Sequence, residues 1–434
     1  MASKESRIII LGCGAWGLST ALHLTLAGYT DITILERAET IPSRFSAAYD
    51  LNKIVRAEYE DDFYSKLALD AIKGWKTPLF GPYYHQTGYV VGTTGKAPEK
   101  AITHMEKALN SIEHNPAFAP GIKRLNSAAD FREYTWQYSG PLTGFKGYFN
   151  RLAGYAHSSD AMEGIWHHVS ARGVKSILGE QAGKVVRLSY SPSGVATHVV
   201  TADGKKHEAD IVISALGAYG ASIIPGLGKS SVARCWSVAH IQLTKAECDL
   251  LRGIPTTNIR DLGFFFEPDP HTGLFKLCPL GIGYTNTNSK GISLPPSDRL
   301  APQDFIPKAD EDKLRQLLRE TFPWMADRPF VDKKMCWFSD TESSDYCIDF
   351  VPDSGKSVVV LAGDSGHGFK MMPIFGKFVL ELLKKGEQSE SRWQWKSQAE
   401  GMSGWGDNVS WRIGQGGELN EHIGPRDRLI SAKL

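Results

Sequence analysis

The sequence predicts a mixed α/β fold, in which a layer of parallel strands and helices is interleaved with a second, antiparallel sheet. Three observations predict it. Residues 8–11 are an apolar run that passes directly into glycines and then into a helical pattern, as in a strand–turn–helix unit. Residues 211–215 and 358–362 are two further apolar runs that lead into glycines. Residues 231–285 alternate apolar and polar side chains, which is typical of antiparallel strands.

The elements follow one another in an order that fits this class. Residues 31–36 form the second strand of the first unit. Residues 185–215 predict a strand, a Ser-Gly hairpin, a second strand, a turn and then a buried strand. Helices are expected at residues 18–28, 162–173 and 310–322. Residues 386–434 are rich in Gly, Ser and Trp and are expected to be irregular.

Length and composition exclude several classes of protein. A chain of 434 residues exceeds one small core, so two closely connected domains are expected. Its 42% hydrophobic and 22% charged residues are typical of a soluble globular protein. A net charge of +1 offers no electrostatic basis for binding nucleic acid or a membrane surface. Six cysteines without a C-x-x-C pair predict neither a disulfide framework nor a metal site.

The two ends of the chain bear on where the protein acts. The N-terminal MASKES is polar, so no signal peptide is expected, and no run of about 20 apolar residues predicts a membrane span. The C-terminal Ala432-Lys433-Leu434 is similar to the Ser-Lys-Leu peroxisomal address. We therefore expect a peroxisomal protein, or a cytoplasmic one if this tripeptide is not recognised as a targeting signal.

The glycines after the first strand predict a dinucleotide site. Gly12 permits a tight turn, Gly14 lets the backbone approach a pyrophosphate, and Gly17 lets the helix pack on the strand. The N-terminus of that helix supplies N–H donors and a partial positive charge to the phosphates. Glu36 ends the second strand 19 residues after Gly17, where an acid accepts hydrogen bonds from ribose hydroxyls. These residues predict a Rossmann-like domain.

Two later segments favour FAD over a nicotinamide cofactor. The strand that ends in Ala215-Leu216-Gly217 follows a pattern by which many flavoproteins return the chain beneath the flavin. The glycine-rich LAGDSGHGF, residues 361–369, suits a loop that approaches an isoalloxazine ring. A nicotinamide enzyme requires neither segment, so the sequence predicts FAD.

Taken together, these segments resemble the sarcosine oxidase and fructosyl-amino-acid oxidase family of flavoenzymes, within the D-amino-acid-oxidase-like fold. The resemblance runs from about Arg7 to about Leu383 and is carried by the motifs GCGAWGLSTALHL, AAYDLNKIVRAEY, GFFFEPD, KMCWFSDTESSDYCIDFVP and GDSGHGFKMMP. We expect an FAD-binding domain of residues 1–80, 151–230 and 336–385, a substrate domain of residues 81–150 and 231–335, and a tail of residues 386–434.

The resemblance also assigns residues to the cofactor. Cys336 stands where the family attaches FAD through the flavin 8α carbon, an electron-poor position to which a thiolate adds, whereas Cys347 is not expected to serve. The expected FAD-binding residues are Gly12, Gly14, Ala15, Trp16, Gly17, Glu36, Arg37, Ser43, Lys53, Val185, Ala215, Gly217, Cys336, Asp364, Gly366, Gly368, Phe369 and Lys370.

Residues for catalysis and substrate binding follow from the same resemblance. Lys276 matches the lysine that promotes reaction with O2, because a fixed ammonium stabilises the negative charge developing on oxygen. Arg56 and Lys370 match the pair that binds the substrate carboxylate in sarcosine oxidases. Further substrate contacts are expected from Lys53, Trp236 and Arg412.

The sequence departs from the fructosyl-amino-acid oxidases at one informative place. Those enzymes carry an Asp-Glu pair after the cysteine equivalent to Cys278, and the glutamate contacts the sugar-bearing substrate, but here Pro279 and Leu280 follow. The departure favours an oxidase of N-substituted amino acids, which forms an imine that hydrolyses and reduces O2 to H2O2. If a protein base is required, His240 and His367 are candidates.

Several alternatives remain open from the sequence. The chain is expected to be a monomer that acts on a small amino-acid-derived amine of the sarcosine, pipecolate, saccharopine or N-methyl amino acid type. The alternative substrate is a fructosyl amino acid. The alternative activities are a dehydrogenase that passes electrons to another protein, and a flavin-binding protein without turnover.

Overall fold

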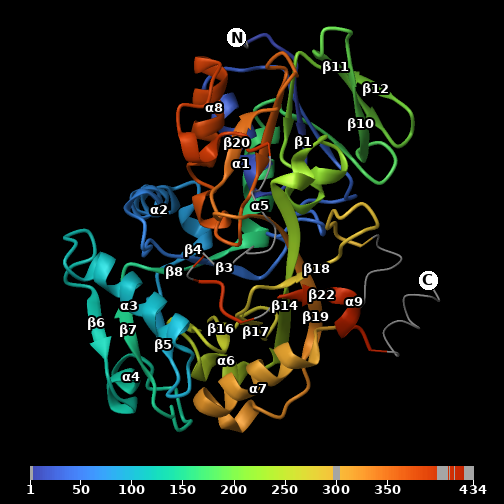
Figure 1. Ribbon diagram of the computed structural model, residues 1–434. Helices are drawn as coiled ribbons and strands as arrows, with labels where there is room; N and C mark the ends of the chain where they lie inside the picture. Colours follow the sequence, from blue (N-terminus) through green and yellow to red (C-terminus); the bar gives the residue numbers. More distant parts are fainter. Residues whose placement is uncertain (1–2, 297–303, 398–408, 410, 415, 425–434) are drawn as a thin grey trace.

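The computed structural model describes residues 3–296, 304–397, 409, 411–414 and 416–424. A six-stranded sheet with its helices forms the upper part of the molecule in Figure 1, and a ten-stranded sheet forms the lower part. The long strand β14 (Ser231–Gln242) runs from one part to the other. None of the helices in these ranges has the length and apolar character needed to span a membrane. The tripeptide 432–434 lies outside the described residues.

The six-stranded sheet is the predicted parallel layer. Its strands run in the order β20 (Cys347–Phe350), β21 (Val358–Ala362), β13 (Ile211–Ser214), β1 (Ile8–Leu11), β2 (Ile32–Glu36) and β9 (Lys175–Leu178). Every neighbouring pair is parallel except β20 with β21 at the edge. This order confirms the mixed α/β class and shows that β1 lies in the interior of the sheet, between β13 and β2.

Both faces of this sheet are covered, which explains why its strands are almost continuously apolar. Ile8 and Ile10 pack among the helices α1 (Ala15–Leu26), α5 (Ser158–Ser170) and α8 (Phe375–Lys385). Ile9 and Leu11 point the other way, into a core shared with a small antiparallel sheet. The strands of that small sheet are β10 (Val185–Tyr190), β11 (Ala196–Thr201) and β12 (Lys206–Glu208).

The second layer is a large sheet whose strand order is β22 (Gly417–Glu418), β18 (Tyr284–Thr285), β14, β17 (Leu274–Pro279), β16 (Gly263–Phe265), β15 (Thr256–Ile259), β5 (Tyr89–Thr93), β7 (Lys146–Asn150) and β6 (Ile122–Leu125). Strand β19 (Val331–Thr341) pairs with β14 along most of its length. The antiparallel pairing predicted for residues 231–285 is confirmed by β14 with β17 and β18, and by β16 with β15 and β17. The sheet also contains two parallel pairs with strands from outside this range, β15 with β5 and β18 with β22.

The remaining described elements surround these layers. A three-stranded sheet consists of β3 (Asn52–Val55), β8 (Gly154–His157) and β4 (Tyr84–His85). The other α-helices are α2 (Asp62–Trp75), α3 (Glu99–Glu113), α4 (Ala128–Tyr134), α6 (Lys245–Leu250), α7 (Lys308–Thr321) and α9 (Leu419–His422). The domain boundaries stay a prediction, and the one between residues 335 and 336 falls inside β19.

Candidate active site

A large cavity lies where the carboxyl ends of the parallel strands face the ten-stranded sheet. Its walls are formed by the segments that follow β1, β2, β13 and β21 and by side chains of β14, β17 and β19. Every cofactor-binding or substrate-binding residue expected from the sequence lines this cavity, except Gly17 and Arg412. Ligands of open α/β sheets bind at this edge. The fold therefore brings residues that are far apart in the sequence to one place.

The turn between β1 and α1 forms one end of the cavity. Gly12 has a φ of +97°, a conformation that glycine adopts without strain. Gly17 lies behind this turn, where an added Cβ would come within 2.1 Å of the Gly12 carbonyl oxygen, so the glycine lets α1 pack directly on it. Gly14 precedes α1 without providing a side-chain cap, which leaves the N–H groups of the first turn for a ligand. A pyrophosphate is the natural acceptor for such donors.

The end of β2 adds a buried carboxylate and a stacking surface. Glu36 accepts hydrogen bonds from two backbone N–H groups and from the Ser43 hydroxyl, each at 2.9 Å. These contacts fix the carboxylate and leave acceptor capacity for a ribose hydroxyl. The guanidinium of Arg37 lies 3.4 Å from the centroid of the Phe45 ring and 5.1 Å from that of Tyr219. Together with the glycine turn, these groups fit the adenosine diphosphate half of FAD.

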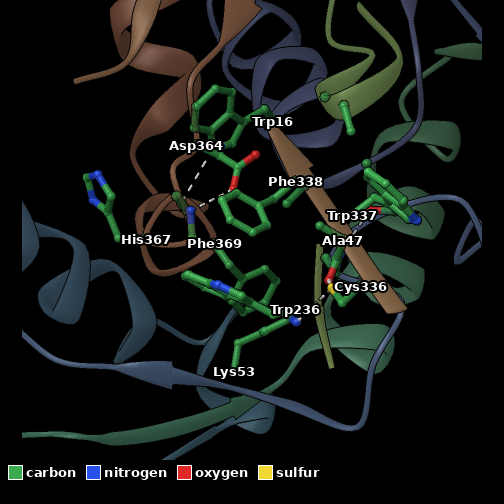
Figure 2. Close-up of a pocket in the computed structure, with 18 of the residues that line it drawn as sticks. Trp16, Ala47, Lys53, Trp236, Cys336, Trp337, Phe338, Asp364, His367 and Phe369 are labelled. Carbon is green, nitrogen blue, oxygen red and sulfur yellow. Dashed lines mark hydrogen bonds between the residues drawn. The ribbon is translucent and has the colours of Figure 1, made fainter. Parts of the chain in front are cut away.

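Cys336 lies on the cavity wall in β19, next to the segment that leads into β3 (Figure 2). Its thiol donates to the carbonyl oxygen of Ala47 at 3.5 Å, and the Nζ atom of Lys53 lies 3.8 Å from Sγ. Cys347 lies in β20, does not line the cavity, and has a pKa that burial raises to about 12. Cys336 therefore lines the cavity with an ammonium group close to its sulfur, unlike Cys347.

Lys276 in β17 is fully buried and belongs to a network of charges. Its Nζ donates to the carboxylate of Asp50 and to the carbonyl oxygen of Asn52, both at 2.6 Å. The same Asp50 oxygen accepts from Lys53 at 2.8 Å, and the Nζ of Lys334 lies 3.7 Å from the other oxygen. Three lysines therefore surround one carboxylate that has no exposed surface.

The ionisation of this network follows from its burial and its charges. Burial raises the pKa of Asp50, but the ammonium groups outweigh it and hold the pKa well below its usual range. Burial lowers the pKa of Lys276, and the charge of Asp50 opposes part of that effect. For Lys53 the carboxylate prevails over burial and the pKa is raised. Sequence reasoning missed Asp50, although it stands three residues before Lys53 in AAYDLNKIVRAEY.

Arg56 and Lys370, which are 314 residues apart in the sequence, meet at one tyrosine. The guanidinium carbon of Arg56 lies 4.7 Å and the Nζ of Lys370 5.4 Å from the centroid of the Tyr59 ring. Nζ of Lys370 also donates to the Tyr59 hydroxyl and to the carbonyl oxygen of His367, both at 2.9 Å. Burial and the charge of Arg56 lower the pKa of Lys370. A bound carboxylate would stabilise both cations.

The two candidate bases lie in different surroundings. His367 lines the cavity, with Nε2 2.9 Å from the Ser344 carbonyl oxygen and Nδ1 3.1 Å from the hydroxyls of Tyr59 and Tyr346. Burial holds its pKa well below the usual range, so the imidazole is neutral and donates through Nε2. His240 does not line the cavity, and burial lowers its pKa to about 4.

Three further residues bear on the substrate pocket. Trp236 lines the cavity and packs on the glycine loop after β21, where an added Cβ at Gly366 would come within 2.3 Å of its ring. Leu280 also lines the cavity, at the position where the resemblance leads one to expect a glutamate. Arg412 lies outside the cavity wall, is 3% exposed, and pairs with Asp340.

The fold and the cavity are those of a dinucleotide-binding protein, and comparison with known proteins identifies its family. The model of the FAD dependent oxidoreductase family, DAO, matches residues 7–382. The chain belongs to this family. It is an FAD-dependent oxidoreductase, and the family includes oxidases that act on secondary amines. The resemblance deduced from the sequence motifs is therefore confirmed.

Individual relatives span nearly the whole chain. L-saccharopine oxidase of Schizosaccharomyces pombe is 33% identical over 411 residues, which cover 90% of this chain and 93% of the relative. Monomeric sarcosine oxidase of a Bacillus species is 24% identical and covers 89% of this chain and 94% of its own length. The structure of the deglycating fructosamine oxidase Amadoriase II of Aspergillus fumigatus, in complex with FSA, is 30% identical, with a TM-score of 0.88 and coverage of 99% and 100%.

Proposed function

We propose that the protein is an oxidase of N-substituted amino acids that binds its substrate by the carboxylate and releases H2O2. The main support for this proposal is that Arg56 and Lys370 both lie close to the Tyr59 ring in the cavity wall. When bound, FAD supplies the acceptor for the electron pair removed from a carbon next to the substrate nitrogen, and water then hydrolyses the imine. Relatives named as saccharopine and sarcosine oxidases support this class of reaction.

The substrate end of the cavity favours a carboxylate over a sugar. Arg56 offers a planar fork and Lys370 a point charge. Lys370 is buried and Arg56 is half-buried, so an anion there is attracted at reduced dielectric constant. Tyr59 fixes Lys370 by accepting its hydrogen bond, so the ammonium is directed before substrate arrives. The neutral imidazole of His367 holds that tyrosine in turn. These residues orient the substrate rather than take its proton.

Lys276 serves the reaction with O2 in this proposal. Its ammonium is fixed by Asp50 and the carbonyl oxygen of Asn52, so it faces the developing negative charge without having to reorganise. Cys336 would hold FAD through a thioether, with Lys53 beside the sulfur. Covalent attachment keeps the cofactor in place through repeated turnover.

A fructosyl amino acid is the second candidate substrate. It is supported by the similarity to Amadoriase II at 30% identity and a TM-score of 0.88. The apolar Leu280 in the cavity wall argues against it, because a leucine cannot accept a hydrogen bond from a sugar hydroxyl. We therefore favour sarcosine-type and saccharopine-type amines over fructosyl amino acids as substrates.

One experiment tests whether Arg56 and Lys370 bind the substrate carboxylate. Peroxide release is measured for the best amine of a panel (sarcosine, pipecolate, saccharopine and a fructosyl amino acid) and for its methyl ester, in the wild type and in Lys370→Ala. Removal of one partner of a buried charged pair costs about 2–5 kcal/mol, so kcat/KM for the acid should fall at least ~30-fold. The ester should be a poor substrate of both proteins. If the wild type oxidises the ester and the acid equally well, the proposal is wrong, and the pocket recognises another part of the substrate.

A further inference from the structure

Arg260 is a buried arginine with no role in the reaction described above. It follows β15 in the turn toward β16, lines the cavity and is 6% exposed. Its backbone N–H donates to the carbonyl oxygen of Gly92 at 2.7 Å, which fixes the turn. Nη1 is 3.5 Å from Oδ1 of Asn258, whereas Nε and Nη2 have no hydrogen-bond partner among the described residues. Nε and Nη2 form the edge of a guanidinium that binds a carboxylate through two parallel hydrogen bonds.

Other cationic side chains lie near Arg260, and no carboxylate of the described residues satisfies its free donors. Arg56 and Lys370 line the same cavity. Burial lowers the pKa of Arg260, and the nearby charge of Arg56 lowers it further. Of the carboxylates in this region, the charge of Glu60, which lies 2.6 Å from Nδ1 of His104, opposes part of this lowering, and burial raises the pKa of Glu58. Neither carboxylate accepts a hydrogen bond from Nε or Nη2 of Arg260. A buried guanidinium with unused donors is costly unless a ligand satisfies it.

We propose that Arg260 binds a second carboxylate of the substrate, so that the preferred substrates are N-substituted amino acids with at least two carboxylates. This inference rests on the proposed function and adds to it. One carboxylate occupies Arg56 and Lys370, and the other accepts from Nε and Nη2 of Arg260. A substrate with a single carboxylate leaves that edge unpaired. Arg260 is then a specificity residue, separate from the pair that every substrate uses.

The kinetic test compares amines that share the reacting group and differ in carboxylate count. Sarcosine and pipecolate carry one carboxylate, whereas N-methylglutamate, iminodiacetate and saccharopine carry two or more. The wild type should oxidise the best of the second group with a kcat/KM at least ~30-fold above that of the first. Arg260→Gln should remove this preference and leave sarcosine and pipecolate within a few fold of the wild type. Arg260→Lys should retain part of it, because an ammonium keeps the charge but not the paired contact.

A binding measurement does not depend on turnover. Thiodiglycolate and (methylthio)acetate replace the amine nitrogen by sulfur and carry two carboxylates and one, and their binding to the holoenzyme is followed by the flavin absorbance. Thiodiglycolate should bind more tightly to the wild type, and Arg260→Gln should bring the two dissociation constants together. Arg234→Gln is the control, because Arg234 is buried but pairs with Asp340 at 3.1 Å outside the cavity. It should leave the ratio unchanged.

The outcomes separate this inference from the proposed function. If no secondary amine in the panel releases peroxide, the proposed function itself is wrong. If amines are oxidised but the wild type shows no preference for a second carboxylate, only this inference fails. It also fails if Arg260→Gln lowers kcat/KM equally for every substrate, since Arg260 would then contact the carboxylate that all of them share. If Arg260→Gln does not fold, the inference is still tested by the kinetics of Arg260→Lys and by the binding of thiodiglycolate and (methylthio)acetate to the wild type.

Discussion

Substitution of Asp50 by asparagine should slow the reaction with O2 and leave substrate binding by Arg56 and Lys370 unaffected. Asp50 is fully buried, and its carboxylate is 2.6 Å from the Nζ of Lys276 and 2.8 Å from that of Lys53. Asparagine is nearly isosteric and keeps a carbonyl acceptor, so the change removes mainly the negative charge. Lys276 then remains as a buried ammonium with no compensating carboxylate.

The magnitude follows from this geometry. Two unit charges at 2.6 Å interact by about 6 kcal/mol when the effective dielectric constant is about 20. The amide oxygen and local relaxation recover part of this, so we expect a loss of about 3–5 kcal/mol in the free energy of unfolding, as for other broken buried pairs. Burial already lowers the pKa of Lys276, and loss of Asp50 lowers it further. The ammonium is charged only below its pKa, so the variant should lose this charge at a lower pH than the wild type.

The assay is the rate at which reduced protein is reoxidised on mixing with O2, measured across pH. Asp50→Asn should be slower by ~10²-fold or more at alkaline pH, as for the loss of one preorganised charge, and should recover as the pH falls. Anaerobic reduction by substrate should change far less. The control is Asp70→Asn, whose partner Lys73 is 2.7 Å away at an exposed site, and whose effect should stay within about 0.5 kcal/mol. Reoxidation with the wild-type rate and pH profile in a destabilised Asp50→Asn protein would refute the reasoning.

Three further outcomes are expected. Lys276→Met should slow reoxidation by ~10²-fold or more, and a defect confined to anaerobic reduction would reassign the residue. Acid-precipitated wild-type protein should stay yellow and Cys336→Ala should release its FAD; if the wild type releases all of it, the attachment is not covalent. Glu247 accepts two hydrogen bonds from Arg328, which lower its pKa to about 2. Its stabilisation is present above its ordinary pKa near 4.5 and lost as the pH falls toward 2, so Glu247→Gln should cost about 1 kcal/mol at pH 7 and little at pH 3 in denaturant unfolding. An equal deficit at both pH values would contradict this pH dependence.

The parts of the fold that were predictable depend on local patterns. The apolar run 8–11 is β1 with the same bounds, because a buried parallel strand is apolar at every position. The following helix begins at Ala15, three residues before the expected start at residue 18, because Gly14 ends the turn and the small and apolar residues after it already have helical geometry. The parallel pairing of β5 with β15 was not predictable, since it joins residues 167 positions apart and no local pattern in the sequence indicates it.

The same distinction applies to the site. Gly12, Gly14 and Glu36 line the cavity, and they could be proposed from the sequence because turn geometry and strand ends leave a local pattern. Asp50 and Arg260 were missed because their importance arises from contacts with distant parts of the chain. Asp50 meets a lysine 226 residues away. Arg260 follows a strand in a segment without a motif, and only its burial and unpaired donors distinguish it from a surface arginine.

The two groups of cations in the cavity are compensated in different ways. Around Lys276 the chain supplies its own counter-charge, Asp50, so this charge is fixed before any ligand binds. Arg56, Lys370 and Arg260 form no ion pair with a carboxylate of the described residues, although Glu58, Asp364 and Glu60 lie near enough to raise their pKa values in part. A preformed charge suits the reduction of O2, a small neutral molecule that brings no charge of its own. Cations without an ion-pair partner suit an anionic substrate, because the substrate carboxylates then provide the missing partners. In our proposal, binding is therefore strongest for a substrate with enough carboxylates to pair with all three cations.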